Sequence, residues 1–177
     1  MTVGQKQDLP PNKIAPIHSR KCLDRFNCGE REIDKWASEK AWKFHDRDRA
    51  RVFVARPDGG GSALGFYSLS FSTENSSKIA KKDRDSWKDG APLVYIDYLA
   101  VLRSTQNSGL GTLLLIDALA RANRVSTEVA FYGVALRSLN DRTTKLYSKY
   151  GFGIAPNEDR HPLMILPIWS VRDLFSE

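Results

Sequence analysis

The sequence has few cysteines and no long hydrophobic run. Its 177 residues include two cysteines, Cys22 and Cys28, which are too few for a disulfide framework and form no paired CxxC motif of a zinc site. The longest apolar stretch, residues 113–120, is interrupted by Asp117 and is far shorter than the ~20 residues of a spanning helix. We therefore expect reduced thiols, no metal site and no membrane span.

Signals for export and for several kinds of catalysis are also missing. The N-terminus has no basic start followed by an apolar segment, so we expect a cytoplasmic protein. No GxxxxGKS or GxxxxGKT phosphate loop occurs. Neither a zinc site nor a serine triad has support, because the histidines do not cluster or follow a ligand spacing: His18, His45 and His161.

What is present fits a globular protein with a basic surface. Hydrophobic residues make up 41% of the chain in discrete runs, which argues against disorder. The 27 Lys and Arg exceed the 21 Asp and Glu, giving a formal charge of +6. This excess indicates either a well-solvated surface or a polyanionic partner, and charge alone does not choose between them.

Hydrophobic periodicity predicts a mixed order of strands and helices. Residues 1–13 are polar and proline-punctuated, so we expect a flexible N-terminal tail before one domain at 14–177. The predicted elements are a helix at 30–47, strands at 52–55 and 64–71 forming a hairpin, a long connection at 72–92, a strand at 93–101, a helix from a glycine turn to about 123, a strand at 129–136, a helix at 140–150, and closing strands within GFGI and LMILPI.

This order predicts an α/β fold in which a mixed central sheet has helices on both faces. The glycine turn at 106–111 then lies at the C-terminal end of a strand, where ligands tend to bind. Its pattern is QxxGxG, and the helix after it exposes unpaired backbone N–H groups that suit a phosphate or pyrophosphate. The alternative is a tight turn whose glycines only permit close packing.

Three motifs together resemble the GNAT superfamily of acetyl-CoA-dependent N-acetyltransferases: LAV at 99–101, QNSGLG at 106–111 and NDRTTKLYSKYGF at 140–152. The resemblance implies a single-domain GNAT fold and acetyl-CoA as co-substrate. It further implies that the strand end lends backbone groups to the pantetheine, that the turn holds the pyrophosphate, and that an asparagine touches the cofactor. The implied residues are Leu99, Ala100, Val101, Gln106, Asn107, Ser108, Gly109, Leu110, Gly111, Thr112 and Asn140.

The segment FNCGEREIDKWASEKA at 26–41 resembles bacterial GNAT toxins of toxin–antitoxin systems. Such toxins acetylate the free amine of aminoacyl-tRNA and so block translation. The resemblance also implies a ribbon-helix-helix antitoxin and a homodimer. Where these toxins often have Gly and Arg before the strand end, this chain has Asp97 and Tyr98, which leaves the acceptor specificity open.

The chemistry of amine acetylation needs little from a base. An α-amino group has a pKa near ~7.7 to 8.0, so much of it is neutral at cytosolic pH. The leaving thiolate needs a proton, and the resemblance gives that role to Tyr147, with an ordinary buried aromatic as the alternative. We interpret Tyr150 as packing. Asp97 either deprotonates the amine through a water or only orients Tyr98 or pairs with an arginine.

Basic residues follow the first predicted helix and its exit, and we expect them to contact tRNA phosphates: Lys35, Lys40, Lys43, Arg47, Arg49 and Arg51. A solvated helix face is the alternative, because acids are interleaved. We expect Trp36 to be a core residue. Two other functions stay open, namely acetylation of a protein N-terminus, a lysine or a small amine, and a non-catalytic acetyl-CoA-binding regulatory module.

Overall fold

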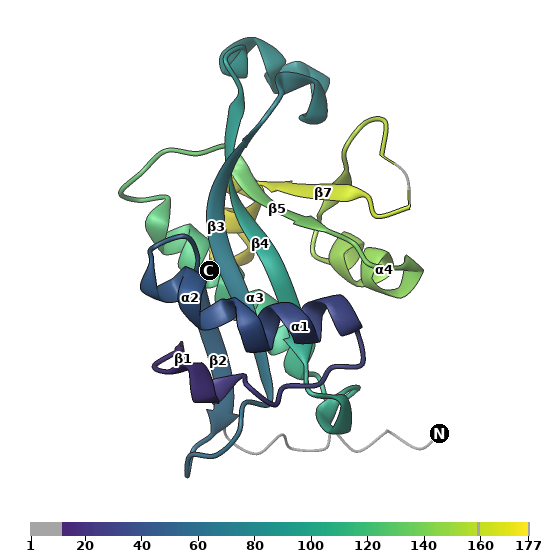
Figure 1. The fold of residues 1–177 in the computed structure, drawn as a ribbon. Helices are drawn as coiled ribbons and strands as arrows, with labels where there is room; N and C mark the ends of the chain where they lie inside the picture. The colour runs from purple at the N-terminus through teal and green to yellow at the C-terminus, as the bar shows by residue number, and fades with distance from the viewer. Residues whose placement is uncertain (1–11, 159, 177) are drawn as a thin grey trace. The chain divides into compact units, whose positions relative to one another are not determined.

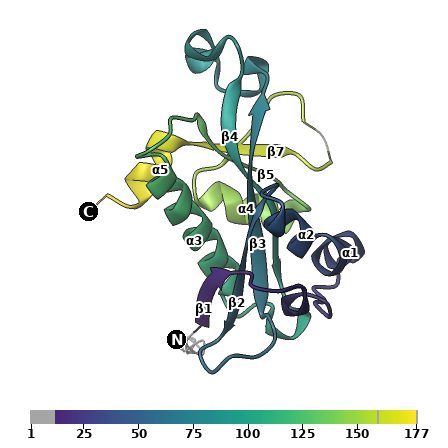
Figure 2. The same cartoon turned by 60° about the vertical axis from the view of Figure 1, so that its left-hand side comes forward.

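The computed structural model describes residues 12–158 and 160–176 (Figures 1 and 2). The strands are β1 (Asn12–Pro16), β2 (Arg51–Pro57), β3 (Gly65–Glu74), β4 (Ala91–Val101), β5 (Gly133–Arg137), β6 (Gly153–Ile154) and β7 (Leu163–Pro167). The helices are α1 (Arg31–Glu39), α2 (Ala41–Asp46), α3 (Leu110–Val125), α4 (Asp141–Lys149) and α5 (Ile168–Leu174), with 3-10 helices η1 (Arg20–Cys22), η2 (Ser76–Lys78), η3 (Lys81–Trp87) and η4 (Arg103–Thr105).

The strands form a seven-stranded sheet in the order β1-β2-β3-β4-β5-β7-β6. Strand β4 pairs with β5 in parallel, while β1 and β2, β5 and β7, and β6 and β7 pair antiparallel. The predicted mixed α/β sheet is therefore confirmed. Contacts within the chain divide it into two compact units, and β3, β4 and α3 each contribute to both.

The first unit comprises the described residues up to Ser68 together with Tyr98–Asp117. Neighbouring residues of β3 face opposite sides of the sheet. Phe66 stacks on Trp36 of α1, whereas a Cβ at Gly65 would lie 2.8 Å from Leu114 of α3. Figure 2 shows α1 and α2 on one side of β3 and α3 on the other. Trp36 is 7% exposed, which confirms its predicted place in the core.

The second unit comprises Leu69–Asp97 and the described residues from Ala118 onward. Its core includes Ile79, Leu93, Tyr132 and Ile165. Strand β5 begins at Gly133, where a Cβ would lie 2.4 Å from the Leu166 carbonyl oxygen. Only glycine permits this close approach of two strands.

The predicted boundaries are wrong at several places. The helix expected at 30–47 is interrupted at Lys40, whose φ of −120° departs from helical values, so α1 and α2 are separate. The strand expected at 129–136 begins only at Gly133. Of the tail predicted at 1–13, residues 1–11 lie outside the described residues, and the last two belong to β1.

The predicted connection at 72–92 is more ordered than its composition indicated. Strand β3 extends to Glu74, β4 begins at Ala91, and η2 and η3 lie between them. Ile79 is the buried anchor of this segment, at 2% exposure. Helix α5 was not predicted, because the apolar run LMILPI passes directly from β7 into the helix through Pro167.

Candidate functional site

The turn between β4 and α3 is held by its own side chains. Thr105 Oγ1 donates to the Leu102 carbonyl at 3.0 Å, and Ser108 Oγ donates to the Thr105 carbonyl at 2.5 Å. Gly109 has a φ of +87° and Asn107 a φ of +63°, both in the left-handed region that bends the chain into the helix. The local sequence therefore fixes a sharp entry into α3.

The second glycine of the turn is not required by packing. Gly111 has an ordinary helical φ, and a Cβ there would lie 3.6 Å from Val101 Cγ2, an ordinary contact. Neither the backbone conformation nor close packing therefore requires a glycine at position 111. A glycine here keeps the backbone open at the N-terminus of α3, where the first N–H groups of a helix have no intrahelical partner and favour anions.

The residues expected to hold acetyl-CoA differ in the exposure of their side chains. Leu110 and Ala100 are buried, so only their backbone groups are suited to a ligand. The other expected residues of the strand end and turn are half-buried or exposed: Leu99, Val101, Gln106, Asn107, Ser108, Gly109, Gly111 and Thr112. The turn is therefore a backbone site with few side-chain contributions.

The side chain of Gln106 connects two segments of the chain by hydrogen bonds, which the QxxGxG motif did not indicate. Its Nε2 donates to the Cys28 carbonyl at 2.7 Å and to the Val101 carbonyl at 3.1 Å. The backbone N–H of Arg103 donates to the Asn27 carbonyl at 2.9 Å. These bonds tie the segment before α1 to the turn, and so connect the motif at 26–41 with the QNSGLG motif at 106–111.

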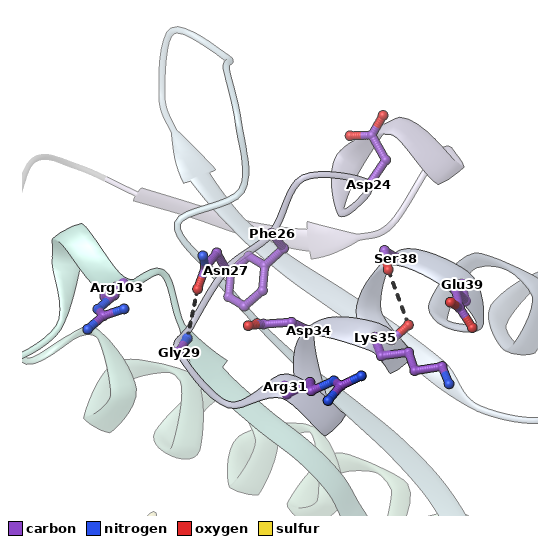
Figure 3. Close-up of a pocket in the computed structure, with 10 residues that line it drawn as sticks. All are labelled: Asp24, Phe26, Asn27, Gly29, Arg31, Asp34, Lys35, Ser38, Glu39 and Arg103. Atoms are coloured by element: carbon purple, nitrogen blue, oxygen red, sulfur yellow. Dashed lines mark hydrogen bonds between the residues drawn. The ribbon is translucent and has the colours of Figure 1, made fainter.

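A groove of about 650 Å³ lies beside this segment (Figure 3). Its lining mixes both charges: the cations Arg31, Lys35 and Arg103, and the acids Asp24, Asp34 and Glu39. One carboxylate is engaged, because Asp34 Oδ1 accepts a 2.7 Å hydrogen bond from the Cys28 N–H. Sequence reasoning missed Arg31 and Arg103, which are distant in sequence and share this groove only in the fold.

The basic residues predicted to contact tRNA are all exposed: Lys35, Lys40, Lys43, Arg47, Arg49 and Arg51. They do not follow one helix, since they lie on α1, at the Lys40 break, on α2, in the segment after α2 and, for Arg51, at the start of β2. Two have intrachain contacts. Arg51 pairs with Asp48 at 2.5 Å, and the Arg49 guanidinium lies 4.2 Å from the centre of the Phe44 ring.

In the second unit, Tyr147 lies on α4 and is 7% exposed. Burial raises the pKa of its hydroxyl to about 12, so it stays protonated at neutral pH. Its ring centre lies 6.0 Å from that of Phe152. Tyr150 is half-buried and ends the helix.

Asn140, expected to touch the cofactor, is the N-cap of α4. Its Oδ1 accepts from the Thr143 N–H at 3.0 Å, while Thr143 Oγ1 accepts from the Asn140 N–H at 3.1 Å. This reciprocal capping box explains why the helix starts here. The side-chain oxygen of Asn140 therefore has a structural partner.

The structure shows part of the surroundings of Asp97, which is predicted either to deprotonate the amine through a water or to orient Tyr98 or pair with an arginine. Partial desolvation raises the pKa of its carboxyl group above the ordinary value, while a hydrogen bond donated by Ser70 Oγ at 2.7 Å opposes the rise. Ser70 is thus a hydrogen-bond partner of Asp97, and the alternative roles of this residue stay predictions. A raised pKa suits a proton acceptor better than an ordinary aspartate does.

The two cysteines are free thiols. Burial raises the pKa of Cys28 to about 11, which keeps its thiol protonated and a poor nucleophile. Across residues 12–158 and 160–176, no group of three His, Cys, Asp or Glu side chains is arranged to hold a metal ion. In the same part of the chain no helix has the length and apolar character to cross a membrane.

A family model described as the acetyltransferase (GNAT) family matches residues 19–152. A tRNA-acetylating toxin of Mycobacterium tuberculosis is 27% identical over 141 residues, which are 80% of this chain and 84% of that protein.

Two solved structures share the fold. AtaT complexed with acetyl-methionyl-tRNAfMet has a TM-score of 0.82 at 22% identity and covers 94% of this chain and 100% of its own. A mutant AtaT toxin bound to the C-terminus of the antitoxin AtaR and acetyl-CoA has a TM-score of 0.76 at 23% identity, covering 94% and 99%.

Proposed function

Because the chain belongs to the acetyltransferase (GNAT) family, we propose that it transfers the acetyl group of acetyl-CoA to the α-amine of aminoacyl-tRNA, and so acts as a translation-blocking toxin. The observation that carries this acceptor is the long match to a relative named as a tRNA-acetylating toxin. The exposed basic residues around α1 and α2 support it, because cations on one surface favour a polyanion.

The turn before α3 suits the phosphates of acetyl-CoA. Backbone N–H groups from Ser108 to Thr112 would hold the pyrophosphate, and Leu99, Ala100 and Val101 would offer backbone groups to the pantetheine. The open backbone at Gly111 supports this assignment. Acetyl-CoA supplies the activated acetyl thioester when bound. The remaining proposed contacts of this group are Gln106, Asn107 and Asn140, of which Gln106 and Asn140 also have the bracing and capping roles described above.

Tyr147 is the proposed proton donor. Its buried hydroxyl is protonated at neutral pH, and a donor is needed where the thiolate leaves. The α-amine of an aminoacyl ester is already partly neutral, so no strong base is required. Asp97, with its raised pKa, would accept the remaining proton through a water.

The acceptor surface would comprise Lys35, Lys40, Lys43 and Arg47, with smaller contributions from Arg49 and Arg51 because these two already have intrachain contacts. Two further parts of the proposal rest on the resemblance, namely a ribbon-helix-helix antitoxin and a homodimer. A cytoplasmic location and a catalytic domain at 14–177 that needs no metal are proposed from the sequence itself.

The decisive experiment measures acetyl transfer from labelled acetyl-CoA to a pool of aminoacylated tRNAs, with uncharged tRNA as the control. After ester hydrolysis, the acetylated amino acid is identified. We expect label on selected charged species only. Label on a protein N-terminus, a lysine or a small amine instead would overturn the acceptor. Intact acetyl-CoA binding without transfer to any amine would indicate a binding module.

A further inference from the structure

A second pocket lies within the second unit. It encloses about 400 Å³ and includes none of the residues proposed above for acetyl-CoA, proton donation or tRNA. Its buried walls are apolar or aromatic, formed by Ile79, Tyr132, Ala155 and Ile165. A concave apolar pocket of this size with a few polar groups at its rim is typical of a binding site.

The rim of this pocket is positively charged. Lys78, Lys81 and Arg84 line it, and no Asp or Glu does so among the described residues. The Arg84 guanidinium is oriented by the carbonyl oxygens of Ile79 at 3.2 Å and Ser77 at 3.0 Å. These bonds use two of its five N–H donors, so donors remain for an anion.

Two carboxylates near the rim are already engaged. Glu158 pairs with Lys78 at 2.8 Å and with Arg137 at 3.0 Å, and Asp83 accepts a 2.9 Å hydrogen bond from the Tyr132 hydroxyl. Lys81 is exposed. The pocket therefore combines an apolar interior with a positively charged rim, in which Lys78 is paired with Glu158 while Lys81 and Arg84 have no ion-pair partner among the described residues.

Strand β6 contributes Gly153 and Ile154 to the same pocket. It is the last strand in the sheet order, so within the described chain only β7 covers one of its edges. Ile154 is 56% exposed, so this strand presents an apolar side chain to a partner as well as its backbone. An open strand edge is a template for an added strand.

We infer that this pocket docks an extended segment of a partner protein in which an acidic residue lies two positions from a bulky apolar residue. Residues two apart in a strand share one face, so both side chains would face the pocket. The apolar side chain enters the interior, the carboxylate meets Lys81 and Arg84, and the segment's backbone pairs with β6. A small organic anion would leave the strand edge unused, which is why a peptide is the better fit.

The test is fluorescence anisotropy with the full chain and a labelled probe peptide, Ser-Glu-Ser-Leu-Ser-Glu, blocked at both ends. Lys81→Glu and Lys82→Glu are a matched pair, since both residues are exposed neighbours but only Lys81 lines the pocket. We expect Lys81→Glu to weaken binding about tenfold and Lys82→Glu less than about twofold. Equal binding by wild type and Lys81→Glu would overturn the proposal.

A second variant fills the pocket mouth. A Cβ at Gly153 would have its nearest neighbour, the Ile165 carbonyl oxygen, at 4.0 Å, and its φ is not left-handed, so Gly153→Leu should fold. We expect it to abolish probe binding with an unchanged Tm, while acetyl transfer to aminoacyl-tRNA is retained.

Two control measurements complete the test. A peptide with lysine in place of glutamate should not bind, and equal binding by it would overturn the charge argument. If the probe does not bind and Gly153→Leu converts a dimer to a monomer in gel filtration, the occupant is a second copy, which also overturns the proposal.

Discussion

The two compact units of the chain carry different kinds of functional group. In the first unit, the turn before α3 offers backbone N–H groups, and most of its side chains are exposed or used for bracing. In the second unit, Tyr147 offers one buried hydroxyl. A backbone site tolerates side-chain changes that preserve the conformation, whereas a single hydroxyl has no substitute. Changes in the turn should therefore alter KM for acetyl-CoA, and loss of the Tyr147 hydroxyl should lower kcat.

The largest expected effect is that of Tyr147→Phe. It removes only the hydroxyl and leaves the ring packed near Phe152, so the fold should persist. We expect kcat to fall by about 100-fold or more, the range for a lost general acid, with KM for acetyl-CoA nearly unchanged. Steady-state acetylation of aminoacyl-tRNA measures both constants.

Tyr150→Phe is the matched control, because it removes a hydroxyl three positions away on the same segment. It should retain wild-type turnover. If Tyr147→Phe also turns over normally while folded and bound to acetyl-CoA, another group donates the proton.

A smaller effect should separate the two glycines of the turn. Gly109→Ala places a methyl group on a residue with a φ of +87°, which strains the turn, and we expect KM for acetyl-CoA to rise about tenfold with kcat little changed. Gly111→Ala adds the same methyl at an ordinary helical φ, where the packing leaves room for it. It should therefore raise KM less than Gly109→Ala does, and only by crowding the proposed pyrophosphate position. Steady-state acetylation with varied acetyl-CoA measures KM and kcat for both variants, and an equal response of the two would contradict a conformational role for Gly109.

Sequence reasoning reached the fold because its evidence was local. Alternating apolar runs gave the order of the strands, and the QxxGxG turn lies between β4 and α3 as expected. The missed features depend on contacts between distant segments. The start of β5 is set by the approach of Leu166 to Gly133, and the order of the 72–92 connection depends on the burial of Ile79. Neither contact has a signature in its own sequence window.

The candidate site shows the same division. The motifs pointed to the turn, to Tyr147 and to Asn140, but a motif does not tell a ligand contact from a structural bond. Gln106 braces the segment before α1 across 78 positions, and Asn140 caps α4. Conversely, Arg31 and Arg103 join one groove although neither lies in a basic run. Contacts between residues distant in sequence can be identified only from the folded structure.

A still smaller effect should distinguish the basic residues of the first unit from one another. Lys43 is exposed on α2, whereas Arg51 already pairs with Asp48. We expect Lys43→Glu to raise KM for aminoacyl-tRNA about fivefold at low salt, and Arg51→Glu to raise it less, with both effects shrinking as salt increases. The KM for acetyl-CoA should not change. An effect that does not depend on salt would argue against phosphate contact.

The smallest effect concerns the stability of the second unit, through the ion pairs of Glu158 with Lys78 and Arg137. Burial alone would raise the pKa of Glu158, but hydrogen bonds from Lys78 and Arg137 outweigh it and leave the pKa below its usual value. A carboxyl group with a lowered folded pKa stabilises the fold above the unfolded value of ~4.3, and this contribution is lost as pH falls through the folded pKa.

Glu158→Gln should therefore lower the free energy of unfolding by at most about 1 kcal/mol at pH 7, since Arg137 is half exposed. The difference in Tm between the variant and the wild type should shrink below pH ~4.3. Thermal unfolding followed by circular dichroism from pH 7 to pH 3 measures this difference, and a Tm gap that stays constant over that range would show that the ion pairs do not stabilise the unit.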